Sequence, residues 1–312
     1  MNFVDKNSIQ KLSVLSLFDG IACGRIALER SGFQVEKYVA YGIEENAIKV
    51  AKTNYPDIEE KGDVFDAIYE KGEFDLLIGG SPCTYWSIAR RNSNKEGIAR
   101  ETVASGLGWE LFLQYIRALE EVKPKYFLYE NNASMSNEIK DCISKKLGCQ
   151  PIEINSADFS AQIRRRLYWT NIPILPYEKS NLLFSDIADT DCEFLTRSIE
   201  KYSDTIKWSK DGLSVKWDTS RKGYYSQANR AKLPNQKWNT VCANRAESKG
   251  NVWLGNNMIR LITMSELEKL QTLPVGYTSC LKNKEMRGKC IGNGWTVDVV
   301  AHIFMGIYQQ KG

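Results

Sequence analysis

A cysteine and a carboxylic acid each follow a segment that predicts a buried strand. Cys83 lies in the loop Gly79-Gly80-Ser81-Pro82-Cys83-Thr84 after the apolar residues 74–78, and Glu130 follows the apolar residues 126–129. Parallel strands present their carboxyl ends at one edge of a sheet, so the thiol and the carboxyl group are expected at the same edge. Together they suit nucleophilic addition to an electron-poor ring that the acid protonates. An ordinary loop cysteine and a helix-capping acid are the structural alternative.

The histidine and cysteine content argues against two other kinds of cysteine site. The single histidine, His302, lies far from Cys83 in the sequence, so a hydrolase with a Cys-His pair is not expected. The eight cysteines contain no Cys-x-x-Cys pair, so we expect neither a structural zinc site nor another bound metal.

A second group of residues has the pattern of a nucleoside site. The turn Phe18-Asp19-Gly20-Ile21-Ala22-Cys23-Gly24 follows the first apolar segment, and its glycines would let a ligand approach the backbone closely. A full Gly-x-Gly-x-x-Gly fingerprint is absent, so a pyrophosphate cofactor is not favoured. Glu44 is suited to bind ribose hydroxyls and Asp63 to bind an adenine amino group. In isolation, each acid could equally be a helix cap.

Alternating strand and helix patterns would position these residues. The alternation predicts βαβ units and a largely parallel, doubly wound α/β sheet with helices on both faces. The expected strands cover residues 13–18, 38–43, 74–78 and 126–129, with a poorly marked strand before Asp63, and the expected helices lie near 26–30, 46–54 and 108–122.

The composition is that of a folded globular protein, with 312 residues, 43% hydrophobic and 26% charged. The first ten residues lack the apolar centre of a signal peptide, and no stretch approaches the about 20 apolar residues that span a bilayer. We therefore expect an intracellular protein without a membrane partner.

Positive charge is concentrated in one region. Residues 201–250 hold eleven Lys or Arg and four Asp or Glu, a net charge of +7, so the chain's total of +4 leaves −3 elsewhere. Aromatic residues are interspersed with the charges. This pattern favours a polyanion as partner, although a solvated basic loop is the alternative.

The change of pattern near residue 179 predicts two domains. Residues 1–178 and 283–312 are expected to form the catalytic domain, and residues 179–282 a smaller mixed domain. A helix is predicted over 260–273, capped by Thr263 or Ser265. Ile291 to Gly294 are expected to form a strand-to-helix corner of the catalytic domain.

Ordered motifs make the chain resemble the DNA cytosine-5 methyltransferases. Residues 15–24 resemble the first family motif, and residues 79–87 resemble the Pro-Cys loop, in a Gly-Gly-Ser-Pro-Cys form similar to that of phage-type and animal de novo members. Further matches are Glu130-Asn131, residues 162–166 (Gln-x-Arg-x-Arg), residues 260–274 and residues 291–297. The resemblance implies a Rossmann-like S-adenosylmethionine-dependent fold, and it places the basic region where the family keeps its target-recognition domain.

The resemblance also implies a mechanism and site residues. Cys83 would add to carbon 6 of a cytosine flipped out of duplex DNA, Glu130 would hold ring nitrogen 3 and the amino group, Arg166 would contact the 2-keto oxygen, and Arg164 would support the loop or the thiolate. The implied S-adenosylmethionine-binding residues are Phe18, Asp19, Gly20, Gly24, Glu44, Asp63, Val64, Pro82, Asn293, Trp295 and Thr296. The implied substrate-binding residues are Ser81, Ser87, Asn131, Gln162 and Arg165.

Two positions depart from the family pattern. Thr84 replaces the glutamine that most bacterial members carry after the cysteine, and Asn132 replaces the valine after Glu130-Asn131, which could alter the fit of the base pocket. A tRNA cytosine-5 methyltransferase and a catalytically silent DNA-binding homologue remain alternatives, although the Cys-Phe-Thr tripeptide of the tRNA branch is absent. We expect a monomer in the cytoplasm of a bacterial or phage-infected cell, acting on double-stranded DNA and paired in some settings with a restriction enzyme.

Overall fold

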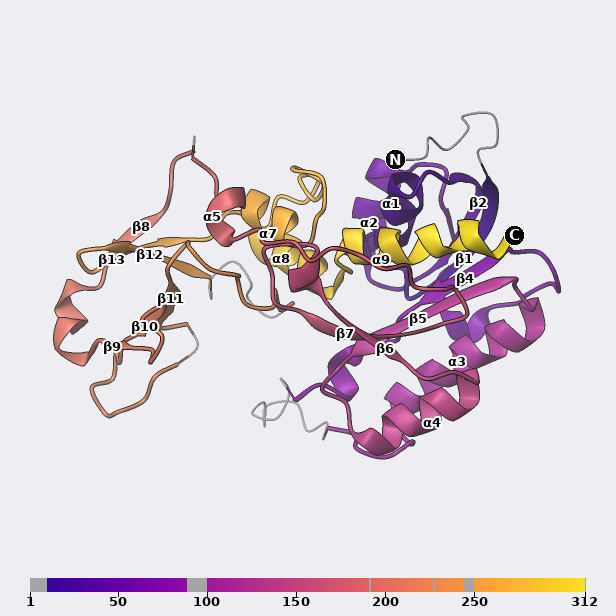
Figure 1. Cartoon of the computed structure of the whole chain (residues 1–312), viewed down its shortest axis with the longest axis horizontal. Helices are drawn as coiled ribbons and strands as arrows, with labels where there is room; N and C mark the ends of the chain where they lie inside the picture. Colours follow the sequence, from indigo (N-terminus) through magenta and orange to yellow (C-terminus); the bar gives the residue numbers. More distant parts are fainter. Residues whose placement is uncertain (1–9, 89–99, 191, 227, 244–249, 312) are drawn as a thin grey trace. The chain divides into compact units, whose positions relative to one another are not determined.

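The computed structural model describes residues 10–88, 100–190, 192–226, 228–243 and 250–311 of the chain (Figure 1). The chain divides into two compact units. Unit 1 contains residues 1–155, 165–177 and 297–312, and unit 2 contains residues 156–164 and 178–296.

Unit 1 is built on a seven-stranded sheet in the order β3-β2-β1-β4-β5-β7-β6. The first five strands of this order pair in parallel, and β7 pairs antiparallel with both β5 and β6. The strands are β1 (Lys11–Leu17), β2 (Gln34–Tyr41), β3 (Glu59–Glu60), β4 (Leu76–Gly79), β5 (Tyr126–Asn132), β6 (Ile152–Asn155) and β7 (Arg165–Thr170).

Helices cover both faces of this sheet, which confirms the expected α/β class. Figure 1 shows α1, α2 and α9 on one side of the sheet and α3 and α4 on the other. The helices are α1 (Cys23–Arg30), α2 (Glu45–Asn54), α3 (Leu107–Val122), α4 (Asn137–Leu147) and α9 (Val297–Met305). Helix α9 contacts the end of α1, because Asp298 forms an ion pair with Arg30 at 2.5 Å, and beyond α9 Tyr308 stacks on Phe33 with ring centroids 4.5 Å apart.

The central strands are apolar on both faces because helices bury both. All four residues of β4 and all seven of β5 are buried. The register aligns Leu17 with Gly79 and Gly79 with Tyr129, so β1 and β4 end at the same level, and β5 continues past them through Glu130 to Asn132. The segments that follow these three strands therefore leave the sheet at one edge, which is where ligands bind in folds of this kind.

Unit 2 contains a six-stranded sheet in the order β8-β13-β12-β11-β10-β9. Its small core packs Ile199, Val215, Trp217, Ala231 and Ile259 together. The strands are β8 (Thr196–Ser198), β9 (Lys207–Trp208), β10 (Ser214–Lys216), β11 (Arg230–Lys232), β12 (Asn251–Gly255) and β13 (Met258–Leu261), and the helices are α5 (Phe184–Ile187), α7 (Met264–Leu270) and α8 (Lys284–Asn293). The 3₁₀ segments of the chain are η1 (Val64–Asp66), η2 (Cys83–Tyr85), η4 (Ser156–Asp158), η5 (Glu200–Thr205) and η6 (Gly306–Lys311).

Thr263 caps α7 as predicted, but the helix is shorter than the expected residues 260–273, because Arg260 and Leu261 belong to β13. The Thr263 hydroxyl accepts the Glu266 N–H at 3.0 Å, and the Glu266 carboxylate accepts the Thr263 N–H at 2.9 Å. This capping box satisfies two donors that the first turn of a helix leaves open.

The prediction for residues 291–294 is wrong, because Ile291, Gly292 and Asn293 are the last turn of α8. The Asn283 side chain caps this helix by accepting the N–H groups of Glu285 and Met286. Residues 283–296 and 156–164 both belong to unit 2, whereas they were expected in the catalytic domain. Whether the two units coincide with functional domains stays a prediction.

One helical stretch of the described chain, Lys284–Gln309, is long and apolar enough to pass a test for membrane spans. It is 72% buried inside the protein, as a core helix would be.

Candidate active site

The turn after β1 has an unusual backbone. Phe18, Gly20 and Ala22 have φ angles of 58°, 67° and 59°, in the left-handed region that costs free energy for residues other than glycine. The Asp19 N–H donates to the Tyr41 carbonyl at 3.2 Å, and α1 begins directly after Ala22. The predicted cofactor residues therefore lie on a preorganised turn that leads into a helix N-terminus.

Asp19 offers an acceptor that the protein itself does not use. Its Oδ1 accepts hydrogen bonds from the Ser16 hydroxyl at 2.5 Å and the Tyr38 hydroxyl at 2.6 Å. Its Oδ2 is buried and has no hydrogen-bond partner among the described residues. Burial raises the pKa of the Asp19 carboxyl, so a cationic group beside Oδ2 would stabilise the ionised form.

Glu60, the last residue of β3, adds a second acid to this region. Burial, with a smaller contribution from the charge of Asp19, raises the pKa of Glu60 to about 7. A positive charge bound near these two carboxyl groups would favour their ionised forms.

The two acids predicted to bind the nucleoside differ in what holds them. Glu44 occupies the N-cap position of α2, but its side chain makes no capping hydrogen bond. Asp63 caps η1, because its Oδ1 accepts the Phe65 N–H at 3.0 Å. Asp63 therefore acts in part as a cap, and the Glu44 carboxylate accepts from the Asn46 side chain at 3.5 Å, so the nucleoside contacts of both acids stay predictions. An exposed apolar side chain accompanies each acid: Ile43 is 74% exposed and Phe65 is 44% exposed.

The backbone beside Asp63 is held from α3. Arg117 donates from Nη2 to the carbonyl of the buried residue Val64 at 2.8 Å and from Nη1 to the carbonyl of Ala67 at 2.9 Å. This guanidinium holds the loop that carries two predicted cofactor residues, Asp63 and Val64, and no sequence pattern singled out Arg117 for this role.

Residues 79–88 carry the predicted nucleophile Cys83 and are called the nucleophile loop. This loop begins at a position that only glycine can occupy. A Cβ atom on Gly79 would lie 2.9 Å from the Leu17 carbonyl oxygen and 3.0 Å from the Tyr115 ring. After Gly79, Pro82 takes the N-cap position of η2, and Cys83 is the first residue of that short helix, with its side chain partly exposed. The thiol is thus presented just beyond the end of β4.

Two buried hydrogen bonds join this loop to the strand that carries the acid. The Ser81 hydroxyl lies 2.6 Å from the Tyr129 hydroxyl, and the Asn131 amide donates to the Ser81 carbonyl at 3.1 Å. Tyr129 and Asn131 flank Glu130. Ser81, two residues before Cys83, is therefore bonded to both neighbours of this acid. Ser81 and Asn131 are 3% and 1% exposed, so these side chains position the loop and are not available for the predicted substrate contact.

Glu130 has a cationic partner on the next strand. Arg166 Nε lies 3.0 Å from Glu130 Oε1, and both side chains are largely buried. The pairing of β5 with β7 produces this contact, because it places Asn132 opposite Arg166. Cys83, Glu130 and Arg166 therefore come from the three elements η2, β5 and β7 of unit 1, and the roles that the resemblance implies for them stay predictions.

Asn132 links the acid strand to the far side of the nucleophile loop. It is 4% exposed, its Oδ1 accepts both the N–H and the hydroxyl of Ser134, at 3.0 and 2.7 Å, and its Nδ2 donates to Asn131 Oδ1 at 3.0 Å. The Ser134 hydroxyl in turn accepts the Ile88 N–H at 3.4 Å. The expectation that Asn132 alters the base pocket is not supported, because its amide is used within the protein.

Unit 2 contains the other predicted residues of the Gln-x-Arg-x-Arg motif. Arg164 is 4% exposed and donates to the carbonyls of Val241, Gly292 and Gly294. Gln162 is fully buried: its amide donates to the Leu270 carbonyl at 2.9 Å and accepts the Val241 N–H at 2.6 Å. Gln162 thus holds backbone segments together and is not exposed to a substrate. Support of the thiolate by Arg164 stays a prediction.

Comparison with known proteins assigns this arrangement to a family. The sequence profile described as C-5 cytosine-specific DNA methylase matches residues 12–172 and 178–309. The chain belongs to this family. Its relatives include the orphan methyltransferase M.Rho11sI of Bacillus phage rho11s, which is 38% identical over 135 residues, or 42% of this chain and 25% of the phage protein. The type II methyltransferase M.NgoBV of Neisseria gonorrhoeae is 26% identical over 257 residues, or 69% of this chain and 58% of that protein.

Solved structures share the fold. Entamoeba histolytica methyltransferase EhMeth has a TM-score of 0.68 at 15% identity, covering 97% of this chain and 99% of that one. A putative DNA modification methyltransferase of an E. coli prophage has a TM-score of 0.62 at 19% identity, covering 96% and 99%. The Rossmann-like methyltransferase fold expected from the sequence is thereby confirmed. The chain spans about a quarter of the length of the phage methyltransferases that it matches.

The methylase holds its nucleophile loop with residues that the family motifs do not mark. Glu101 accepts the Trp86 indole N–H at 2.9 Å and the Gly108 N–H at 3.1 Å, which ties the loop to the start of α3. Arg100 donates to the carbonyls of Trp86 and Ser134, at 3.0 and 2.7 Å. Trp86 is fully buried, and a tryptophan directly after a Pro-Cys turn was the sequence signal for such an anchor.

The remaining predicted residues of the methylase are accounted for individually. Arg165 is exposed and pairs with Glu153 at 2.5 Å on the surface of unit 1. The Ser87 N–H donates to the Cys83 carbonyl at 2.9 Å, and Gly24 is buried in α1. In unit 2, the Thr296 hydroxyl bonds Gln271 Oε1 and Ser156 Oγ, each at 2.8 Å. Cofactor contacts of Asn293, Trp295 and Thr296 stay predictions.

Two lysines of the basic region, residues 201–250, have structural roles. Lys237 donates to the carbonyls of Ala157, Ser160 and Ser180 at 2.7, 2.9 and 3.0 Å, and burial lowers its pKa. Lys232 donates to the Lys237 carbonyl at 3.1 Å. These two lysines hold unit 2 together, so the contact with a polyanion must come from others.

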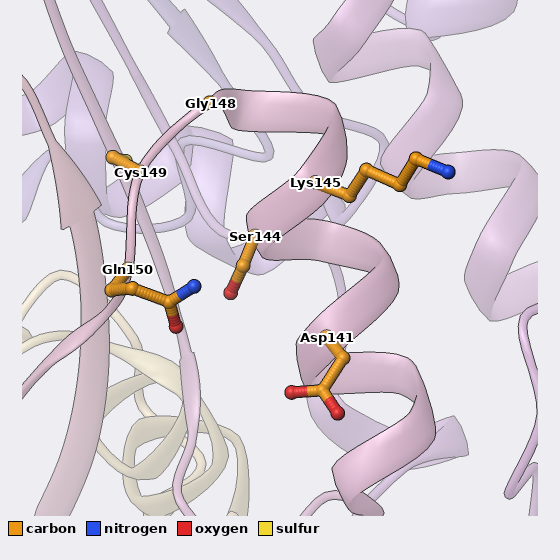
Figure 2. A pocket seen from close by; sticks show the side chains of 6 residues that line it. All are labelled: Asp141, Ser144, Lys145, Gly148, Cys149 and Gln150. Carbon is orange, nitrogen blue, oxygen red and sulfur yellow. The ribbon is translucent and has the colours of Figure 1, made fainter.

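A cavity of about 340 Å³ at the end of α4 contains none of the predicted site residues (Figure 2). Figure 2 shows side chains of α4, together with Cys149 and Gln150 of the following segment, around it. Burial raises the pKa of the Cys149 thiol, which disfavours the thiolate. No group of three His, Cys, Asp or Glu that could hold a metal occurs in the described part of the chain.

Proposed function

We propose that the chain transfers a methyl group from S-adenosylmethionine to carbon 5 of a cytosine in duplex DNA. One observation carries the proposal: the Cys83 loop is bonded to both neighbours of Glu130, and Glu130 is paired with Arg166. A thiol, an acid and a cation on adjacent elements are the groups needed to activate a cytosine ring.

The protein's own residues would prepare the ring. The Cys83 thiolate forms a bond to carbon 6, and the electron pair of the 5,6 double bond becomes available at carbon 5. Glu130 would hold the proton at ring nitrogen 3 and the amino group, while Arg166 would orient the acid and contact the 2-keto oxygen. After carbon 5 has been methylated, loss of its proton to a base and departure of Cys83 restore the double bond and the thiolate.

The residues after β1, β2 and β3 fit a cationic nucleoside cofactor. A sulfonium or ammonium group beside the unpartnered Asp19 Oδ2 would favour the ionised forms of Asp19 and of Glu60, and Glu44 would bind the ribose hydroxyls. S-adenosylmethionine, when bound, supplies the electrophilic methyl group. Phe18, Gly20 and Val64 would line its binding site.

The substrate must leave the helical stack to reach a cysteine held this closely to the sheet. Base flipping provides that access, and the basic residues of unit 2 supply charge for the duplex. The tRNA and silent alternatives are not favoured, because the chain keeps both the nucleophile and the acid and lacks the Cys-Phe-Thr tripeptide.

Covalent trapping tests the proposal. The protein is incubated with S-adenosylmethionine and a mixed-sequence duplex containing 5-fluorocytosine, because fluorine cannot leave carbon 5 as a proton does. We expect a denaturation-resistant protein–DNA adduct that is absent with Cys83→Ala, a loss of at least about 10³-fold in adduct yield. An adduct on tRNA alone, or none on either nucleic acid with the cofactor bound, would overturn the proposal.

A further inference from the structure

A single buried carboxylate organises an exposed turn in unit 2. Asp218 is 2% exposed, and its Oδ1 accepts the Ser220 N–H at 2.8 Å and the Ser220 hydroxyl at 2.6 Å. Its Oδ2 accepts the N–H groups of Gly223 at 2.6 Å and Tyr224 at 3.0 Å. Four donors from the next six residues therefore converge on one side chain, and the turn 219–224 is held in one shape.

Some side chains of the turn bond the rest of unit 2, and others project into solvent. The Thr219 hydroxyl accepts from the Asn229 amide at 3.2 Å, and Arg221, at a φ of 57°, donates to the Lys201 carbonyl at 2.9 Å. Within the described residues, no hydrogen bond or ion pair is found for the side chains of Lys222 and Tyr224, and Tyr224 is 71% exposed. A cation and an aromatic ring thus project from a rigid turn.

Two lysines meet beside the turn without a neutralising acid. Lys207 of β9 and Lys216 of β10 are directly opposite each other in the antiparallel pair. Their Nζ atoms lie 5.0 and 4.8 Å from the centroid of one ring, that of Tyr225, the residue after the turn. Like charges opposite each other on paired strands are destabilising, and no ion pair of either lysine occurs in the described part of unit 2. An anionic partner would remove this repulsion.

We propose that Lys207 and Lys216 hold a backbone phosphate of duplex DNA and that Lys222 and Tyr224 contact the adjacent groove. The proposal rests on the proposed function, which requires a duplex substrate. Both ammonium groups lie against the Tyr225 ring, whose hydroxyl donates to the Thr205 carbonyl at 3.4 Å, and the Asp218 turn gives Tyr224 a fixed direction. Phosphate contacts supply affinity, whereas contacts in the groove distinguish sequences.

Salt-dependent binding tests the phosphate contact without any methyl transfer. Affinity for a mixed-sequence duplex is measured between low and high salt for the wild type and for the double variant Lys207→Gln/Lys216→Gln. We expect the slope of log affinity against log salt to fall by about 1 to 2 and affinity at low salt to fall at least about 10-fold. Lys146→Gln, an exposed lysine of α4 in unit 1, is the control and should leave the slope unchanged.

Sequencing of methylated sites tests the groove contact. Tyr224→Ala should lower the preference for target over non-target sites about 10-fold, and Tyr224→Phe should retain it because the ring remains. An unchanged salt slope in the double variant, or unchanged site preference in Tyr224→Ala, would overturn the inference. A wild type that binds duplex with the expected slope but forms no adduct would overturn the proposed function alone, whereas tighter binding to tRNA than to duplex would overturn both.

Discussion

The nucleophile loop of unit 1 and the 219–224 turn of unit 2 are both presented at the protein surface, but they are held in different ways. The loop around Cys83 is anchored by Tyr129, Asn131, Ser134, Arg100 and Glu101, which come from several elements. The turn depends on one carboxylate, Asp218, which accepts four hydrogen bonds. The loop with the proposed nucleophile is thus held redundantly, whereas the turn proposed to contact DNA depends on one residue.

Removal of Asp218 should give the largest effect that separates the two regions. Asp218→Ala leaves four donors without their acceptor, so we expect duplex affinity to fall about 10- to 100-fold. The adduct rate at saturating DNA should stay within about twofold of wild type, because the nucleophile loop belongs to unit 1. Fluorescence anisotropy and rapid-quench trapping measure the two quantities.

Asp218→Asn is the matched variant for this test, because it keeps the shape of the side chain and one strong acceptor. It should fall between wild type and Asp218→Ala. A loss of adduct rate as large as the loss of affinity would contradict the division of roles between the two regions.

Asn132→Val should test the redundancy of the nucleophile loop. The substitution restores the residue of the family motif but removes the acceptor of the Ser134 hydroxyl, so we expect the rate of adduct formation to fall about 10-fold with cofactor affinity unchanged. Ser134→Ala removes the same link from the other side. The double variant should be no slower than either single one, because both break one connection.

A change in the preference between cytosine and 5-substituted cytosine for Asn132→Val, without a change in rate, would contradict this positioning role. Thermal unfolding of the three variants separates positioning from general destabilisation. Equal melting temperatures with unequal rates are expected.

Glu60→Gln should give the smallest effect, and one that depends on pH. Since the pKa of Glu60 is raised from its ordinary value to about 7, the folded wild type is favoured at low pH and loses stability as the pH rises through 7. The variant lacks this loss. The free energy of unfolding of the variant minus that of the wild type should therefore be larger at pH 8 than at pH 5, by on the order of 1 kcal/mol for a partly solvated group. Urea unfolding at both values measures it, with Glu36→Gln, an exposed acid of β2, as control. Equal differences at the two pH values would contradict the assigned pKa.

Sequence patterns predicted the parts of the fold that depend on local chemistry. The apolar runs before Cys83 and Glu130 are the buried strands β4 and β5, and Thr263 caps α7 as expected. The patterns did not predict β6 and β7, since a strand that returns antiparallel carries no local mark of its direction. They also predicted a strand-to-helix corner at residues 291–294, where the structure has the end of α8. Two glycines favour a turn unless buried contacts keep the backbone helical.

The roles of single motif residues were harder to predict than their presence. Ser81, Asn131 and Gln162 were expected to touch substrate, yet each is buried and bonds the protein's own backbone or side chains. A polar residue in a motif has the same identity whether it faces a ligand or a carbonyl group. Only burial distinguishes these two uses, and burial depends on residues distant in the sequence.

The position of α9 has a consequence for folding during synthesis on the ribosome. Residues 297–308 pack against α1 through the Asp298–Arg30 ion pair and the Tyr308–Phe33 stack, yet all of unit 2 apart from residues 156–164 is synthesised between residue 177 and this helix. The face of the first sheet that α1 and α2 cover is therefore completed by α9 only after unit 2 has been synthesised, so unit 2 can fold before unit 1 is complete.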